Sequence, residues 1–288
     1  MSSTVRGKHC APRAANNKNK SFNTCYSEDD LRTMINTYNE APRSKKIQVN
    51  PQESSNVLWQ MLDERFKPAC DTEYCWLGKL NLQKKVGHRA FRPRAPEGGS
   101  TAWLSTLDIK NVLNQYMDAY PEFLALGAVP MDFCNLNTAV CGLNLEQQKM
   151  AGKTQIGIVF NTDPSTRGGQ HWICMYIDIA AEKPEAWSVN YFDSYGMAPL
   201  APEIKMFLEK LRQQAKGMTF EMNCSDVSGM CTRSVRQQKK NTECGVYCID
   251  FITERLTGTS WSDLLARNNP DEVVQRKRQT FFRPRAWE

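Results

Sequence analysis

The 288-residue sequence lacks long hydrophobic runs. No apolar stretch approaches the roughly 18–20 residues that a helix needs to cross a bilayer, so we expect no membrane partner. The first twenty residues lack the apolar segment of a signal peptide, which favours a protein that is not secreted. Charge of one sign is not in large excess either, because 37 basic and 31 acidic residues leave a net charge of only +6. A dedicated nucleic-acid binder concentrates far more positive charge.

Histidine is scarce, which leaves few ligands for a metal site. Only three histidines are present: His9, His88 and His171. Cys70-x4-Cys75 and Cys224-x6-Cys231 could each hold half of a zinc site, but thiols packed as small core side chains are the favoured interpretation. The eleven cysteines, an odd number, favour free thiols in a reducing compartment over a disulfide framework. A chain with 41% hydrophobic residues can also bury a core without covalent staples.

The N-terminal third predicts a small, mostly helical region. Residues 1–20 carry five basic side chains and no acidic ones, which is typical of a flexible basic arm. Ser27, followed by three acidic residues, is a plausible N-cap for a helix that reaches Tyr38, and a second helix is predicted over 54–66. Residues 86–100 contain several arginines, prolines and glycines and are predicted to form a linker. We therefore expect a helical region and linker over 21–99.

Residues 100–288 alternate between helix-like and strand-like segments. A long amphipathic helix is predicted to open at Trp103. Strands are predicted at 155–161, 171–180, 187–193 and 219–222, and helices at 202–216, 245–256 and 271–281. This pattern predicts the α+β class, with a short central sheet and helices packed around it.

His171 and Asp193 are predicted to lie next to each other. A hairpin centred near residue 182 pairs residues whose numbers sum to about 364, which puts Asp193 opposite His171 on the same face. The carboxylate could then accept the imidazole N–H and fix the ring in place. A lone histidine is more often an ordinary surface or core residue, so the pairing carries the argument.

Cys244 is predicted at the first turn of an apolar helix. Unpaired N–H groups and the positive end of the helix dipole stabilise a thiolate there, although a buried structural thiol is the alternative. Gly245 would leave room for a substrate backbone to approach. The amide of Gln238, six residues upstream, could donate a hydrogen bond to a tetrahedral intermediate together with the N–H of Cys244.

The order His171-Trp172, Asp193, then Gln238-x5-Cys244-Gly245 resembles the Ulp1/adenain superfamily of cysteine proteases. Three stretches are similar to a branch that contains the African swine fever virus polyprotein protease and related proteases of large DNA viruses. They are FNTDPSTRGGQHW (160–172), SVNYFDSYG (188–196) and QKKNTECG (238–245). The similarity is good over about 100–260 and thin over 1–99, where CDTEYC (70–75) carries it. Some viral relatives have asparagine at the position of Asp193, and either side chain can orient a histidine.

This resemblance implies an Ulp1/adenain-like protease core over 100–288 and a role for each residue of the motif. Cys244 would attack the scissile carbonyl, and His171 would move the proton. Asp193 would orient the imidazole, and Gln238 would line the oxyanion hole. Acyl transfer through a thiol needs no metal or organic cofactor.

The resemblance also implies a substrate and a biological setting. Trp172 would wall a narrow channel that admits only Gly-Gly ahead of the cleaved bond, and Asn161 would hold the substrate backbone. The expected protein is a thiol endopeptidase that cleaves Gly-Gly-X sites in viral structural polyproteins during virion maturation, in the host cytoplasm and the virion. The basic arm could contact nucleic acid non-specifically. Gly98-Gly99-Ser100 is a possible self-cleavage site.

Two other functions compete with this one. The first is a protease that removes SUMO or another ubiquitin-like modifier, which would use the same fold. The second is an inactive binding module whose basic arm engages nucleic acid. The intact set of histidine, aspartate, glutamine and cysteine disfavours the second.

Overall fold

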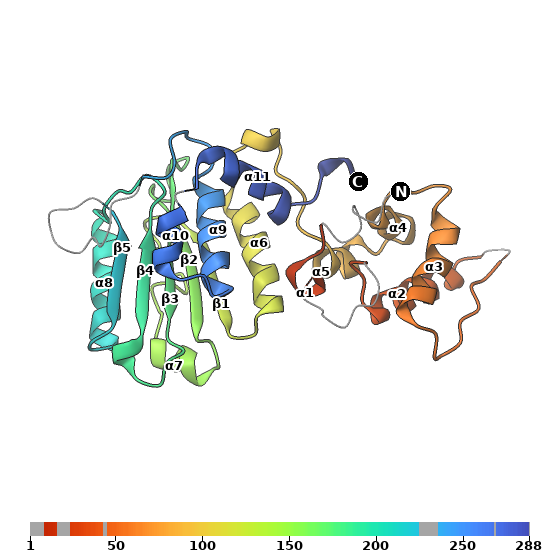
Figure 1. Ribbon diagram of the computed structural model, residues 1–288, viewed down its shortest axis with the longest axis horizontal. Helices are drawn as coiled ribbons and strands as arrows, with labels where there is room; N and C mark the ends of the chain where they lie inside the picture. The colour runs from red at the N-terminus through yellow and green to blue at the C-terminus, as the bar shows by residue number, and fades with distance from the viewer. Residues whose placement is uncertain (1–8, 16–23, 43–44, 225–235, 268, 288) are drawn as a thin grey trace. The chain divides into compact units, whose positions relative to one another are not determined.

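The computed structural model describes residues 9–15, 24–42, 45–224, 236–267 and 269–287. The chain forms two compact units (Figure 1). One unit comprises Met1–Ala95 together with Gln279–Glu288, and the other comprises Pro96–Arg278. No helix of the described residues is long and apolar enough to span a membrane.

The N-terminal unit is helical, as predicted. Both predicted helices are observed, and Ser27 and Asp30 form a capping box at the start of the first. A further helix over 73–80 was not predicted. The elements of this unit are α1 (Pro12–Ala15), α2 (Glu28–Glu40), α3 (Ser55–Phe66), α4 (Glu73–Leu80), the π-helical turn η1 (Gln83–Gly87) and α5 (His88–Ala90).

The expectation of a flexible arm is wrong for residues 9–15. Cys10 and Ala11 are buried, and Cys10 pairs with Phe91 through a β-bridge. The rest of the predicted arm lies outside the described residues. The predicted linker is likewise wrong over its first part, because Val86, Ala90 and Phe91 are buried in the core of this unit. The sequence did not indicate this packing, because the buried apolar residues stand singly among basic ones and form no helical or strand periodicity.

The expectation of free thiols is wrong for most of the described cysteines. The disulfide bonds join Cys10 to Cys25, Cys70 to Cys75 and Cys134 to Cys141, and Cys224 is also disulfide-bonded. Cys70 and Cys75 are therefore bonded to each other and do not form half of a zinc site. The paired residues are 15, 5 and 7 positions apart, so each bond closes a short local loop. An argument from core size alone could not detect such local closures.

The last ten residues belong to the N-terminal unit, whereas the sequence interpretation assigned them to the protease domain. The Arg283 N–H donates to the Pro93 carbonyl (2.8 Å), and the Ala95 N–H donates to the Arg283 carbonyl (2.9 Å). The Arg283 guanidinium also lies 3.8 Å from the centre of the Tyr74 ring. Backbone pairing and a cation–π contact thus fix this segment, which ends in the 3-10 helix η4 (Arg285–Trp287).

The C-terminal unit is built on a five-stranded mixed sheet in the order β1-β2-β3-β4-β5 (Figure 1). The inner pairs are antiparallel, whereas β1 runs parallel to β2 and β5 runs parallel to β4. The strands are β1 (Phe123–Val129), β2 (Gln155–Asn161), β3 (Trp172–Asp178), β4 (Ser188–Phe192) and β5 (Thr219–Asn223). The helices are η2 (Gly99–Thr101), α6 (Thr106–Ala119), α7 (Leu145–Met150), η3 (Pro184–Ala186), α8 (Pro202–Gln214), α9 (Cys244–Leu256), α10 (Trp261–Arg267) and α11 (Asp271–Phe281). The predicted α+β class is confirmed.

Helices cover both faces of this sheet. On one face, the apolar stripe of α8 joins the buried side chains of β2, β3 and β4 in one core cluster. On the other face, α9 packs against β3 and β2, and Phe251 stacks on Phe192 with ring centres 4.7 Å apart. Gly157 allows this approach, because a Cβ there would lie 2.8 Å from the Ile252 side chain. The sheet therefore holds the first turn of α9 close to the ends of β3 and β4.

The predicted hairpin register is wrong by two residues. Cys174 pairs with Phe192 and Met175 with Tyr191, so the numbers of paired residues sum to 366. Extending this register past the ends of the strands places Tyr195, and not Asp193, opposite His171. The short helix η3 lengthens the connection and shifts its centre. A shift of two preserves the face to which each side chain points, so His171 and Asp193 remain diagonal neighbours.

Candidate active site

Cys244 is the first residue of α9, at the start of the helix as the sequence predicted. Its thiol is free, and the residue is 5% exposed. The side chain of the N-cap residue, Glu243, makes no capping hydrogen bond. The N–H groups of the first helical turn are therefore not occupied by a side-chain cap.

His171 lies immediately before β3 and contacts Asp193, which follows β4. Its Nε2 is 2.7 Å from Asp193 Oδ1, and both side chains are largely buried. Nδ1 is thus the ring nitrogen left to face Cys244. Burial lowers the pKa of His171, but hydrogen bonding and charge interactions with Asp193 and Cys244 outweigh that effect and raise it to about 9. The imidazole is therefore in reach of both the carboxylate and the thiol, and it is protonated at neutral pH.

The carboxylate of Asp193 is held by Tyr195, the second residue after it. The Tyr195 N–H donates to Asp193 Oδ1 (2.8 Å), the same oxygen that contacts His171. The Tyr195 ring lies over the imidazole with centres 4.6 Å apart, and its hydroxyl donates to the Lys240 carbonyl (2.9 Å). Tyr195 thus links the histidine to the loop before Cys244. Sequence reasoning missed this residue, which the correct hairpin register would have placed opposite His171.

Gln238 is fully buried beside Asp193, in contact with Ser194. The Ser194 hydroxyl donates to Gln238 Oε1 (2.6 Å), and the Ser194 carbonyl accepts the Gln238 N–H (2.8 Å). Gln238 Nε2 is buried and has no hydrogen-bond partner among the described residues. Buried polar groups are nearly always paired, so an unpartnered donor here is a strong indication of a ligand position. The sequence contained no signal for the role of Ser194.

Helix α11 fastens the loop between Gln238 and Cys244 at both ends. After Gln238, the Asp271 carboxylate accepts the N–H groups of Lys239 (3.0 Å) and Lys240 (2.8 Å). Before Cys244, Glu243 forms a buried ion pair with Arg278, whose Nε lies 2.8 Å from Oε2. Through Asp271 and Arg278, α11 therefore fixes the position of both ends of this loop. Asp271 and Arg278 lie more than 30 residues after the loop residues that they contact, so no local sequence pattern indicated these contacts.

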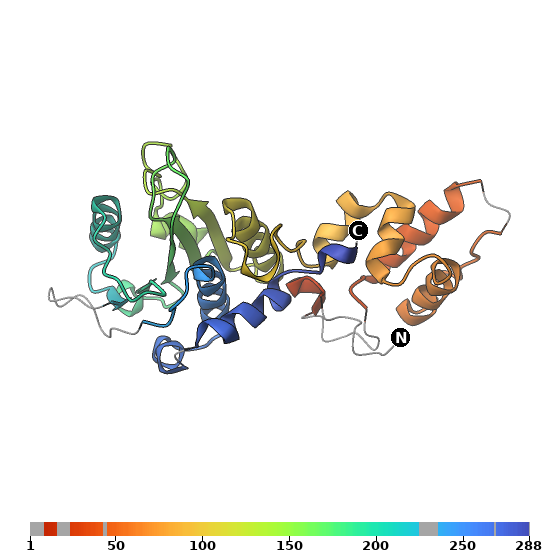
Figure 2. The same cartoon turned by 90° about the horizontal axis from the view of Figure 1, so that it is seen from above.

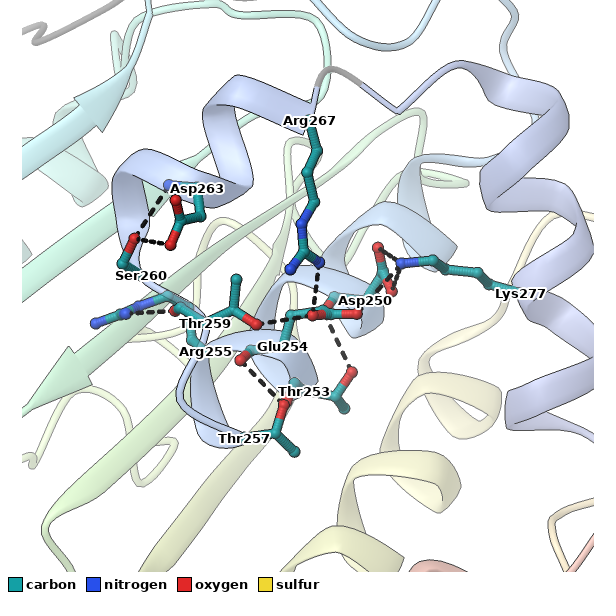
Figure 3. Close-up of polar contacts among 10 residues, drawn as sticks. All are labelled: Asp250, Thr253, Glu254, Arg255, Thr257, Thr259, Ser260, Asp263, Arg267 and Lys277. Carbon is teal, nitrogen blue, oxygen red and sulfur yellow. Dashed lines mark hydrogen bonds and ion pairs between the residues drawn. The ribbon is translucent and has the colours of Figure 1, made fainter.

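The same helix is tied to α9 by charged side chains (Figure 3). Lys277 donates to both oxygens of Asp250 (2.6 and 2.7 Å), and Arg267 of α10 pairs with Glu254 (2.9 Å). Figure 2 shows α9 and α11, in blue, on the same side of the unit. The helix that begins at Cys244 and the helix that holds the preceding loop thus form one connected assembly.

Three residues were predicted to bind substrate: Trp172, Asn161 and Gly245. Trp172 and Asn161 line a cavity of about 510 Å³. Trp172 is 7% exposed, and its indole N–H donates to the Leu104 carbonyl (2.9 Å), so its ring is fixed. Trp103, which is 50% exposed, lines the same cavity and was not predicted as a site residue. Two tryptophans thus contribute to its wall.

Gly245 has a structural reason to lack a side chain. A Cβ at this position would lie 3.0 Å from Leu104 Cβ and 3.3 Å from Trp172 Cδ1. The space beside Gly245 is therefore occupied by the wall of the cavity, whereas the sequence interpretation reserved it for substrate. Leu104 and Trp172, which line the cavity, are therefore also the residues packed against Gly245.

A free thiol at a helix start, an imidazole between that thiol and a carboxylate, and a buried amide donor define the site of a thiol hydrolase. Residues 144–284 match the family model described as "Ulp1 protease family, C-terminal catalytic domain". Residues 144–284 therefore form an Ulp1-like catalytic domain, and the protein is a thiol protease.

Relatives of viral origin match nearly the whole chain. A protein of Acanthamoeba polyphaga mimivirus named as a thiol protease is 28% identical over 297 residues, covering 95% of this chain and 93% of the relative. An African swine fever virus protein named as a SUMO-1 cysteine protease is 27% identical over 264 residues, covering 83% of this chain and 90% of that protein. A crystal structure of the African swine fever virus protease has the same fold, with a TM-score of 0.67, 20% identity and 96% coverage of each chain.

Proposed function

We propose that Cys244, His171 and Asp193 form the catalytic triad of this protease. With its proton transferred to His171, the sulfur of Cys244 attacks the scissile carbonyl carbon. The protonated His171 then gives that proton to the departing amine as the C–N bond breaks. Water then attacks the thioester, His171 takes a proton from it, and the C–S bond breaks to release the acid. The observation that carries this proposal is the imidazole held 2.7 Å from Asp193 while it interacts with Cys244.

The oxyanion of the tetrahedral intermediate has two candidate donors. One is the unpartnered Nε2 of Gln238, and the other is the N–H of Cys244 at the open end of α9. Donors that are already in position stabilise the developing negative charge without reorganisation. This supports Gln238 as the oxyanion-hole residue.

We further propose that the substrate carries Gly-Gly ahead of the cleaved bond. Leu104 and Trp172 both lie against Gly245, so the cavity wall approaches the nucleophile closely. A substrate segment with no Cβ atoms suits so close an approach, with Asn161 available beside it. The specificity would then be steric.

The proposed substrate is a viral structural polyprotein cleaved at Gly-Gly-X sites, at assembly sites in the host cytoplasm and in the virion. The viral relatives match the N-terminal unit as well as the catalytic domain, which favours this setting. The name of one relative refers to SUMO-1, so removal of a ubiquitin-like modifier is the second candidate. Contact of the N-terminal arm with nucleic acid remains a proposal on residues that lie mostly outside the described ones.

A cleavage panel separates these substrates. The full chain is incubated with Gly-Gly-X peptides, with matched Ala-Gly-X and Gly-Ala-X peptides, and with SUMO and ubiquitin conjugates. We expect efficient cleavage only after Gly-Gly, in peptides as well as in polyprotein fragments. Faster cleavage of a SUMO or ubiquitin conjugate than of any peptide would favour the second candidate. Equal cleavage of the alanine-containing peptides would contradict the steric argument.

Ser194 provides a test of the role of Gln238. Ser194→Ala removes the hydroxyl that holds Gln238 Oε1, so the amide can rotate away from the oxyanion, and we expect kcat to fall about tenfold with little change in KM. Ser194→Thr keeps the hydroxyl and should restore activity. In a Gln238→Ala background, Ser194→Ala should have no further effect on kcat. A loss of equal size in both backgrounds would show that Ser194 does not act through Gln238.

A further inference from the structure

The cavity lined by Trp103 and Trp172 has a polar end as well as its tryptophan wall. It extends from the segment before α6 to the loop that connects β2 and β3. Two charged residues line it: Asp163 and Arg167. The polar end is therefore supplied by the loop 161–170, whose last residue precedes His171.

Hydrogen bonds hold this loop in one conformation. The Asp163 N–H donates to Asn161 Oδ1 (2.9 Å), and the Asp163 carbonyl accepts the Met131 N–H (2.9 Å). The N–H and hydroxyl of Ser165 donate to the Asp132 carboxylate (2.7 and 2.6 Å). The backbone on each side of Asp163 is thus fixed before any substrate binds.

The side chain of Asp163 has no such partner. The residue is only 9% exposed, and its carboxylate makes no hydrogen bond or ion pair with the described residues. Arg167 lines the same cavity, but its side chain is exposed and is not within ion-pair distance of the Asp163 carboxylate. The carboxylate therefore has unfilled acceptor positions at the cavity, and a ligand that brings N–H groups into the cavity would fill them.

We propose that Asp163 forms a specificity subsite that binds a lysine or arginine side chain of the substrate, N-terminal to the Gly-Gly pair. This inference rests on the proposed function, because Trp172, which would wall the Gly-Gly channel, lines the same cavity. A cationic side chain matches a carboxylate best, because charge-assisted hydrogen bonds are about twice as strong as neutral ones. Arg167 would repel such a cation, but it is exposed to solvent, so this repulsion is screened.

A peptide series tests the subsite. Each of the four positions before Gly-Gly is varied in turn among lysine, arginine, glutamine, alanine and glutamate, and kcat/KM is measured with the full chain. At one position we expect lysine or arginine to exceed glutamate by about ten- to a hundredfold. Asp163→Asn should abolish that preference while changing kcat/KM for the alanine peptide less than threefold. Asp163→Glu, which keeps the charge, should retain part of it.

Arg167→Gln is the matched control, because it removes the other charge of the cavity. The preference for basic residues should persist or increase in this variant. A preference that survives in Asp163→Asn overturns the inference, as does a preference for glutamate that disappears in Arg167→Gln. If Gly-Gly peptides are cleaved with no basic preference, the subsite fails while the proposed function stands. If no Gly-Gly peptide is cleaved, the proposed function fails and the subsite fails with it.

Discussion

Replacing Cys244 by alanine is expected to lower kcat for Gly-Gly-X peptides by on the order of 10⁴-fold or more, because no other group can form the acyl-enzyme. His171→Ala should cause a loss of similar order, since the two groups act as a unit. The measurement is peptide turnover followed by chromatography. Circular dichroism and thermal unfolding of each variant show that the fold survives.

Cys248 provides the matched control for the nucleophile. It is a second free, buried thiol in α9, one helical turn after Cys244. Cys248→Ala should retain nearly full kcat and lose only stability, because it leaves a small cavity in the core. If folded Cys244→Ala protein still cleaves, or if Cys248→Ala is the inactive variant, the assignment of the nucleophile is wrong.

The pH dependence of this reaction follows from the raised pKa of His171. Below about pH 9 the imidazole holds the proton that the departing amine requires, and above it that proton is lost. The alkaline limb of kcat/KM should therefore have its midpoint near pH 9. Asp193→Asn keeps a hydrogen-bonding group but removes the charge that favours the protonated ring, so the midpoint should move to lower pH. An unchanged midpoint in this variant would show that Asp193 does not set it.

Replacing Arg278 by methionine is expected to lower the free energy of unfolding by about 3–5 kcal/mol, because it leaves Glu243 as a buried carboxylate without its counter-ion. In the intact protein the side chains of Arg278 and Glu243 are only 7% and 2% exposed. Activity should fall as well, since Glu243 immediately precedes Cys244. Urea unfolding and kcat measured on the same samples test both effects.

Two further variants isolate the buried ion pair. Arg276→Met makes the same substitution at an exposed position of α11 and should change stability by no more than about 0.5 kcal/mol. Adding Glu243→Gln to Arg278→Met removes the unpaired charge, so the double variant should be more stable than Arg278→Met alone. A double variant that is less stable than Arg278→Met would mean that charge burial is not the cause.

The sequence predicted the elements whose patterns are local. The runs that became β2, β3 and β4 are rich in β-branched and aromatic residues, and α9 has a continuous apolar face. β1 escaped prediction because FLALGAV is composed largely of leucine and alanine, which are not typical strand residues. It is a strand because it pairs with β2 in the folded unit, and tertiary pairing overrides such preferences.

The same distinction applies to the candidate site. The proximity of His171 and Asp193 follows from a hairpin, and the position of Cys244 follows from a helix start, so both could be predicted. Gln238 stood out only through the motif. Ser194 and Arg278 contact their partners across 44 and 35 residues, and no local pattern reports such contacts.

The attachment of α11 also determines how far this protein can be shortened. Judged by the triad alone, a minimal protease fragment could stop soon after Leu256. Such a fragment would lack Asp271 and Arg278, and with them both anchors of the segment that precedes the nucleophile. A trimmed version intended for expression or crystallisation should therefore run at least to Arg278, and to Phe281 to keep the helix whole.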